Sequence, residues 1–438
     1  MLKLRILWEE LHSSFWFIPG LIVLVAVSLA LGLVQIDDAL LQRNGLYGRW
    51  PRLLGSGPGG ARDLLGTVAN SMIAVAGVVF SITIVALALA SNQYTSRVLR
   101  NFMRDRINQS VLGVFVGIYA YCLVVLRTIR DTEEVLFVPS VAVLVGLLLA
   151  FAGIAIFIYF IHHISLAIQA ANILAEITEE TLFAIDLQYP EDLGEQDDAS
   201  VSSSADPGAG WQPLLAHSNG YLQSFDTRAL LGFAQRHDTV IRAVRTVGDF
   251  VVKDTPLAYL RSADFEQREI EGLRDCYAVG RQRTVEQDAG FGIRQIVDVA
   301  MKALSPGIND TTTAQMCINH LTAILHKLAG RRIECQYQAD DNRVRLFTCG
   351  PSYAHFVDVA FNQIRQNAAA NVAVLHNLLW ALELLFDAAA SDARQQVLAA
   401  HVALVADVCR RSVAADVERR QLLERAHGLL EKMPASAA

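Results

Sequence analysis

Four long apolar stretches dominate the first 165 residues of the chain. They cover residues 15–34, 68–90, 111–126 and 135–161. A helix needs about 20 apolar residues to cross the hydrocarbon core of a bilayer. The first two stretches contain no charged residue, the third ends at Arg127, and Pro139 interrupts the start of the fourth. The pattern therefore predicts a four-span transmembrane domain in residues 1–165.

The first apolar stretch has a signal peptide as its alternative interpretation, because Lys3 and Arg5 give it a basic start. A signal core is usually shorter than this stretch, and a small-residue cleavage site normally follows it. No clear Ala-x-Ala site follows residue 34. The sequence therefore favours a retained membrane anchor.

The basic residues between the apolar stretches predict the orientation of the bundle. Cytoplasmic loops carry an excess of Lys and Arg. The loop between the second and third stretches contains Arg97, Arg100, Arg104 and Arg106, opposed by Asp105 alone. The first loop also contains four arginines, which weakens the contrast. We expect the second loop, both termini and everything after residue 161 on the cytoplasmic side.

The second apolar stretch carries small and weakly polar residues at helical spacing. They are Asn70, Ala74, Gly77, Ser81 and Ala88, and these intervals place them on one helix face. Such a face is typical of close helix packing in lipid, and it also suits the wall of a water-filled path. The centres of the four stretches hold no Asp, Glu, Lys or Arg, which argues against a proton-coupled pump.

The remaining two-thirds of the chain alternates between polar breaks and mixed apolar–polar segments. We expect an α+β cytoplasmic domain with a helical C-terminal part after the membrane bundle. The expected segments are a helix leaving the membrane (166–185), a linker (186–213), a small β-rich module (214–262), an α+β domain (263–350) and a C-terminal helical region (351–438).

Composition supports the membrane assignment and excludes some functions. The 438 residues are 53% hydrophobic, with a mean hydropathy of +0.32, which is high for a soluble protein. The formal net charge of −7 argues against a nucleic-acid partner, which would require a basic surface. The six cysteines form no Cys-x-x-Cys pair, so neither a disulfide framework nor a cysteine zinc site is expected.

Three segments of the chain resemble a known family. They are residues 80–91 (FSITIVALALAS), 287–294 (QDAGFGIR) and 303–310 (ALSPGIND). Together they resemble a bacterial integral membrane protein family of unknown function, domain of unknown function 2254, over nearly the whole chain. The family pattern has a proline where this chain has Thr311. The resemblance implies a bacterial inner (cytoplasmic) membrane location and no established reaction.

The cytoplasmic part contains one group of polar residues that suggests a ligand site. Gln287, Asp288, Arg294, Asn309 and Asp310 lie around two predicted helix starts, where small anions or cations can bind. A helix cap at Asp310 and an ion pair at Arg294 are simpler roles. No phosphate-binding loop or hydrolase motif occurs in the sequence. We therefore expect no enzyme activity, no cofactor and no metal ion.

These features leave two functions open. The first is a homo-oligomeric ion channel or small-solute transporter subunit with a cytoplasmic assembly or gating domain, because four spans seldom enclose a path alone. The alternative is a membrane-anchored sensor or scaffold that conducts nothing. The expected partners are the lipid bilayer, further copies of the chain and a small ion or ligand at the cytoplasmic domain.

Overall fold

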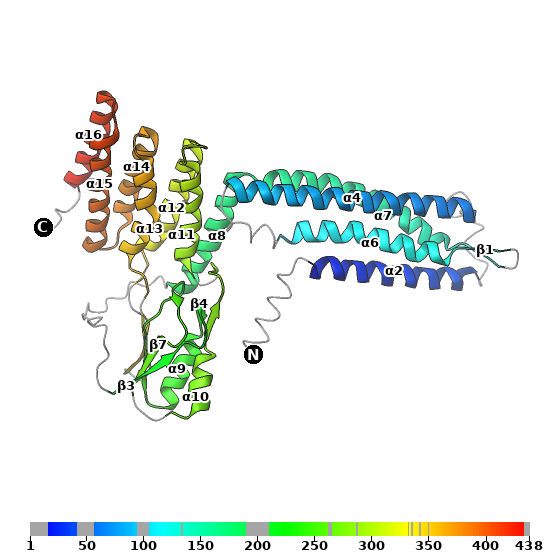
Figure 1. Ribbon diagram of the computed structural model, residues 1–438, viewed down its shortest axis with the longest axis horizontal. Coiled ribbons are helices and arrows are strands. Elements are labelled where there is room, and N and C mark those ends of the chain that lie inside the picture. The colour runs from blue at the N-terminus through cyan, green and yellow to red at the C-terminus, as the bar shows by residue number, and fades with distance from the viewer. Residues whose placement is uncertain are drawn as a thin grey trace. The chain divides into compact units, whose positions relative to one another are not determined.

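The computed structural model (Figure 1) divides the chain into two compact units, Met1–Gln169 and Ala170–Ala438. The structure describes residues 16–41, 57–93, 105–132, 135–189, 210–261, 265–285, 288–331, 333, 336–340, 343–348 and 350–432. The expected fold class, a four-span helical bundle followed by an α+β domain, is confirmed.

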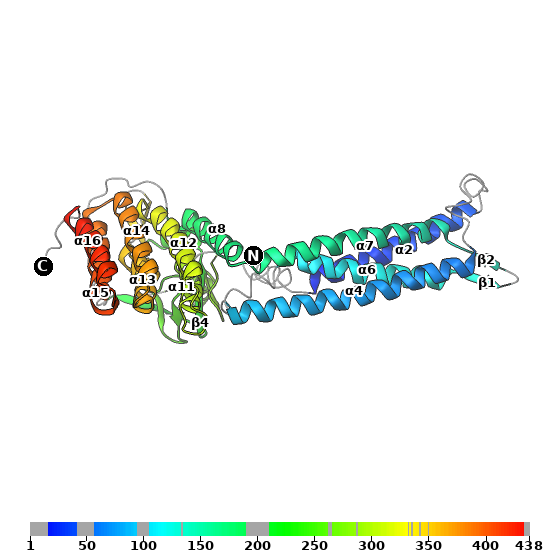
Figure 2. The same cartoon turned by 90° about the horizontal axis from the view of Figure 1, so that it is seen from above.

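Among the residues that the structure describes, the first unit contains four helices that run alongside one another (Figures 1 and 2). They are α2 (Phe17–Leu41), α4 (Pro58–Gln93), α6 (Arg106–Thr128) and α7 (Ser140–Ala167). Each is long and apolar enough to cross a membrane. The 36 residues of α4 extend about 54 Å at about 1.5 Å per residue, well beyond a hydrocarbon core of about 30 Å.

Glycines allow α6 and α7 to approach their neighbours closely. A Cβ built on Gly113 would lie 2.8 Å from the Cα of Pro19, and one on Gly146 would lie 2.9 Å from a methyl group of Leu65. Gly153 faces Met72 in the same way, at 3.2 Å. Small residues permit such contacts in lipid, where apolar burial alone favours association little. These glycines therefore form packing seams inside the protomer.

The fourth helix begins at Ser140, five residues later than the apolar run. Val135–Phe137 form strand β2 instead, which pairs with β1 (Arg130–Thr132) in an antiparallel hairpin. The residue before a proline is restricted to extended conformations. Pro139 accordingly stands at the N-cap of α7, and the chain turns helical only after it.

The first helix continues past its apolar run and includes an acidic residue with a structural role. Asp37 is fully buried, and its two carboxylate oxygens accept hydrogen bonds from the backbone N–H groups of Val141 and Ala142 (3.1 and 2.9 Å). Helix starts leave their first N–H groups without intrahelical partners. Asp37 therefore caps α7 from a neighbouring helix.

The second unit contains seven further helices in a packed group, among the residues described. They are α8 (Ala170–Gln188), α11 (Ala289–Ala303), α12 (Thr311–Ala329), α13 (Tyr353–Ala368), α14 (Val372–Ala388), α15 (Asp392–Ser412) and α16 (Asp416–Lys432). Figure 1 shows α11 to α16 standing side by side. Side-chain caps begin several of them: Asp310 accepts from the N–H of Thr313, and Ser352 accepts from that of His355. Such caps are favoured at helix starts.

A β-rich module completes the second unit. Its sheets have the strand orders β3-β7-β5-β10-β9 and β6-β4-β8, and helices α9 (Thr227–Arg236) and α10 (Gln267–Arg274) accompany them. The strands are β3 (Trp211–Leu215), β4 (Gly220–Phe225), β5 (Val240–Ala243), β6 (Phe250–Val251), β7 (Pro256–Arg261), β8 (Tyr277–Gly280), β9 (Gln336–Asp340) and β10 (Arg343–Thr348). Because β10 pairs in parallel with β5, the sheet joins strands from both sides of the boundary expected at residue 262.

Candidate functional site

The small and weakly polar face of α4 points away from the core of its own helical bundle. Asn70, Ala74, Gly77, Ser81 and Ala88 are all exposed. The buried residues of α4 lie on the opposite side of the helix, since successive residues are about 100° apart. They include Leu65, Met72, Val79 and Ala86. The predicted residues therefore share one face of α4, and the described residues of the chain leave this face uncovered.

The glycines of this face leave open space beside α4. No described atom lies within 4 Å of a Cβ built at Gly66 or Gly77. Gly113 and Gly146, by contrast, have close neighbours inside the bundle. At Gly66 and Gly77 a second helix can approach the α4 backbone, between exposed large residues such as Ile73, Val78 and Phe80.

The outer face of α7 has a different character. Its exposed residues include Leu148, Phe151, Ile154 and Ile158, which are large and apolar and suit contact with lipid tails. Asn70 and Ser81 offer polar groups for which lipid provides no hydrogen-bond partner. The exposed side of α4 also carries Ile73, Val78, Phe80, Ile84 and Val85, so its small and weakly polar face is a stripe between apolar residues that suit lipid.

The two adjacent histidines at the end of α7 have separate environments. His163 Nε2 lies 2.7 Å from the Oδ2 atom of Asp105, whose other oxygen accepts from the N–H of Ile107. Asp105 thus caps α6 and joins it to α7 at the same time. His162 is exposed. The described residues contain no group of three or more His, Cys, Asp or Glu side chains placed to hold a metal ion.

The polar group predicted in residues 287–310 is distributed over both ends of α11. Asp288 precedes this helix and Asp310 follows it, so the 15 residues of α11 separate them by about 22 Å. Arg294 pairs with Asp298 one turn further along, at 3.3 Å. Asn309 adopts a left-handed φ of 48° in the turn before α12. Gln287 lies outside the described residues.

Asp288 forms the best-connected ion pair of this region. Its side chain is 6% exposed and accepts two hydrogen bonds from Arg283, at 2.7 and 2.9 Å, and one from the N–H of Phe291. Burial raises the pKa of Asp288, and the Arg283 guanidinium opposes that shift. A Cβ at Gly248, which has a φ of 96°, would lie 2.5 Å from this carboxylate. The backbone at Gly248 therefore covers the Asp288 carboxylate on this side. Asp288 also caps the start of α11.

The glycine-containing motif after Asp288 packs closely against helix α8. A Cβ at Gly292 would overlap Thr181 Oγ1 and lie 2.9 Å from Thr181 Cβ. On α12, His320 Nδ1 lies 2.8 Å from the hydroxyl of Thr178. Helix α8 contacts both α11 and α12. The residues that resemble the family pattern thus pack against the helix that follows the fourth span.

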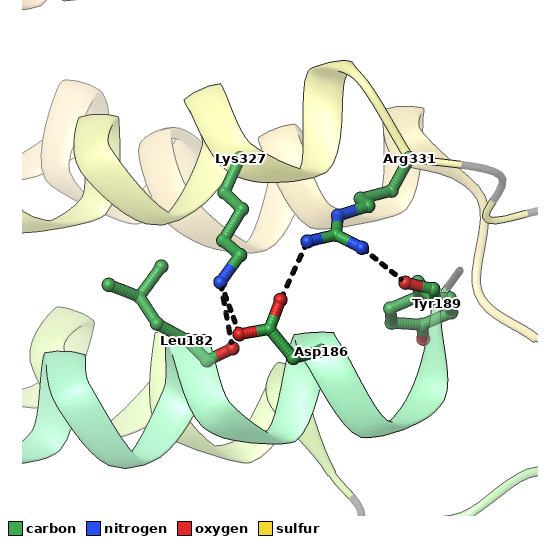
Figure 3. Close-up of polar contacts among 5 residues, drawn as sticks. All are labelled: Leu182, Asp186, Tyr189, Lys327 and Arg331. Atoms are coloured by element: carbon green, nitrogen blue, oxygen red, sulfur yellow. Dashed lines mark hydrogen bonds and ion pairs between the residues drawn. The ribbon is translucent and has the colours of Figure 1, made fainter. Parts of the chain in front are cut away.

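An ion-pair cluster secures the C-terminal end of α8 (Figure 3). Asp186 accepts hydrogen bonds from Lys327 of α12 and from Arg331, which follows the C-cap of α12, both at 2.6 Å. Arg331 also donates to the carbonyl of Tyr189 at 3.1 Å. The hydrogen bond from Lys327 is the main cause that lowers the pKa of Asp186. The sequence pattern assigned Asp186 to the linker, and only the basic pair at spacing i, i+4 hinted at an acidic partner.

Helix α8 therefore belongs firmly to the second unit while following closely on the membrane bundle. Only Ile168 and Gln169 separate its first residue from the end of α7. The arrangement defines a multi-pass helical membrane protein whose last span leads into an anchored helix of an α+β domain.

Comparison with known proteins places this class in a family. The chain belongs to the family described as predicted membrane protein (DUF2254), whose model matches residues 12–384. An uncharacterized protein of Mycobacterium tuberculosis strain CDC 1551 is 33% identical over 427 residues, covering 95% of this chain and 80% of the relative. An uncharacterized protein of Mycobacterium bovis is 34% identical over 429 residues, with the same coverage. No solved structure matches the chain.

Proposed function

We propose that the protein is a subunit of a homo-oligomeric ion channel or small-solute transporter, assembled around the exposed face of α4. The observation that carries this proposal is the position of Asn70, Gly77 and Ser81 on the side of α4 away from its own core. Small residues and residues with polar side chains suit close helix contacts or the wall of a polar path. Contact with lipid tails stabilises them little. In this proposal further copies of the chain bury this face in a subunit interface, because homo-oligomers with closed symmetry are common.

The cytoplasmic domain has the assembly or gating role in this proposal. Helix α8 is held by Gly292 and by the Asp186 cluster, and two residues connect it to α7. A ligand or neighbouring subunit that shifts α8 would bias the position of the last span. Both termini and the second unit lie in the cytoplasm of a bacterium in this proposal, in agreement with the positive-inside rule.

Ion flux in liposomes tests the conducting function. The wild type, Ser81→Leu and Ser28→Leu are reconstituted and compared over a range of potentials and pH values. Ser28 is a matched control because it is also an exposed serine within a span, on α2. We expect flux from the wild type and Ser28→Leu, and at least about a tenfold reduction for Ser81→Leu, equivalent to about 1.4 kcal/mol.

Absence of flux from the wild type at every potential and pH would contradict conduction. The protein would then fit the alternative of a membrane-anchored sensor or scaffold. Equal flux from Ser81→Leu and the wild type would place any path away from the α4 face. Mass measurement in detergent addresses assembly separately, since a clean monomer of 48.0 kDa would exclude a path formed between subunits.

A further inference from the structure

Helices α9 and α10 of the β-rich module border an open cavity of about 440 Å³. Helix α9 lines it with residues at i, i+3, i+4 and i+7, beginning at Ala229, and α10 lines it with Glu269, Gly272 and Leu273, followed by Cys276 just beyond its end. One face of each helix therefore forms a wall. Small-molecule sites commonly occupy about 300–1,000 Å³. The cavity is therefore of a size for one small molecule and too small for a docked helix.

A glycine stands in the middle of each wall. Gly232 lies on α9 and Gly272 on α10, and no described atom comes within 4 Å of a Cβ built on either. Glycine is among the least favourable residues inside a helix, and neither glycine has a positive φ. The two glycines leave the backbones of both helices open to the cavity, so a ligand can approach each of them closely.

The floor and rim of the cavity indicate which ligand would fit. Phe233 and Leu273 are buried and form an apolar floor. The His237 ring stacks on Phe233 with centroids 4.4 Å apart, and Phe265 meets His237 edge-on at 5.8 Å. Aromatic groups in this arrangement favour a further flat ring that can stack or pack edge-to-face with them.

A carboxylate at the rim supplies a hydrogen-bond acceptor. Glu269 Oε2 accepts from its own capping-box N–H at 2.9 Å, and Oε1 lies 3.5 Å from His237 Nε2 across the cavity. These contacts orient the side chain, and a carboxylate has room for further donors. Cys276 also lines the cavity, but burial raises the pKa of its thiol to about 11, which makes it a poor nucleophile at neutral pH.

We propose that this cavity binds a small planar heteroaromatic molecule with a ring N–H group, of the indole or purine class. The ring lies between Gly232 and Gly272 on the Phe233 floor, and its N–H donates to Glu269. This site goes beyond the proposed channel function and does not depend on it, because all its residues belong to the cytoplasmic module.

Titration of the full-length protein in detergent tests the site, with indole and adenine as separate probes and calorimetry as the readout. We expect saturable binding of at least one probe to the wild type. Gly272→Leu fills the cavity and should weaken binding at least about tenfold. Gly428→Leu is the matched control and should bind the probes as the wild type does. Gly428 lies in helix α16, and a Cβ built on it would also have open space around it.

Thermal unfolding of each variant shows whether it has folded, and Gly232→Leu on the opposite wall replaces Gly272→Leu if the latter unfolds. Glu269→Gln should weaken binding less than the filled cavity does. Failure of both probes to bind saturably to the wild type would overturn the proposal. Equal binding by the wild type and the filled variants would also overturn it, since the ring would then occupy another place.

Discussion

Gly292 shows how a single missing side chain determines the packing of two helices. Gly292 lies near the start of α11, which begins at Ala289, and directly against Thr181 of α8. Its neighbour Gly290 has a different environment, where a Cβ would lie 3.3 Å from the Asp288 carboxylate and 3.5 Å from Phe356. The Gly-x-Gly spacing therefore reflects two close approaches within the protein and no nucleotide-binding loop.

Gly292→Ala should destabilise the second unit by about 1–3 kcal/mol, because the added methyl group overlaps Thr181 and forces α8 away from α11. Thermal unfolding measures the effect. Gly428→Ala on α16 should be neutral or slightly stabilising, since it adds helix propensity in open space. Adding Thr181→Ala to Gly292→Ala should restore part of the lost stability. Unchanged stability of the single variant Gly292→Ala would contradict the close contact between Gly292 and Thr181.

Asp186 should make the attachment of α8 dependent on pH. Its folded pKa is lowered by Lys327 and Arg331, so its stabilising contribution is present above the unfolded pKa of about 3.9 and is lost as the pH falls through the folded value. Asp186→Asn should cost at most about 1 kcal/mol at pH 7, because the side chain is 47% exposed and water screens the pair.

Stability curves of the wild type and Asp186→Asn at several pH values check this prediction. The difference between the two proteins should shrink below about pH 4. Asp407→Asn is a suitable control, because Asp407 pairs with Arg411 on the exposed side of α15 and does not contact α8. A difference that stays constant down to pH 2 would show that charge pairing is not the cause.

At the scale of elements, the start of α7 depends on a side chain from α2. Asp37→Ala removes the acceptor for the N–H groups of Val141 and Ala142, and buried donors without partners are costly. We expect a loss of about 1–3 kcal/mol, with a smaller loss for Asp37→Asn. Asp38→Ala is the matched control because Asp38 is exposed. Equal unfolding temperatures for Asp37→Ala and Asp38→Ala would contradict the cap.

The elements that sequence patterns predicted well are those determined by local chemistry. Apolar runs located the four spans, and Asp310 marked a helix start that the structure contains. The helices extend beyond the apolar runs because backbone hydrogen bonding continues into polar ends, as at Asp37. The face of α4 followed from helical spacing alone.

Contacts between distant segments could not be predicted in this way. Residues of β5 and β10 are about a hundred positions apart, and strand patterning does not identify a partner. Asp186 and Lys327 are separated by 141 positions, so the sequence did not identify Asp186 as the acidic partner of the basic pair. The polar group at 287–310 looked compact along the chain, but a helix separates its two ends.

At the scale of the whole molecule, the central claim is that copies of the chain cover the α4 face of one another. The bundle packs Gly113 and Gly146 internally and leaves Gly77 and Ser81 exposed. A membrane protein that kept this face towards lipid would gain nothing from its small residues. Assembly through α4 would bring several polar stripes together, which is the arrangement that a path between subunits requires.

Oxidative crosslinking in native membranes tests this claim most directly. Ala74, Gly77, Ser81 and Ala88 are replaced singly by cysteine, with Ala155→Cys on the exposed side of α7 as the control. The native cysteines are first replaced by serine or alanine. A disulfide needs Cα atoms within about 7 Å, so it reports direct approach of two α4 helices. We predict a product of twice 48.0 kDa for at least one α4 position and none for Ala155→Cys, whereas crosslinking at Ala155→Cys alone, or at no position, would contradict assembly through α4.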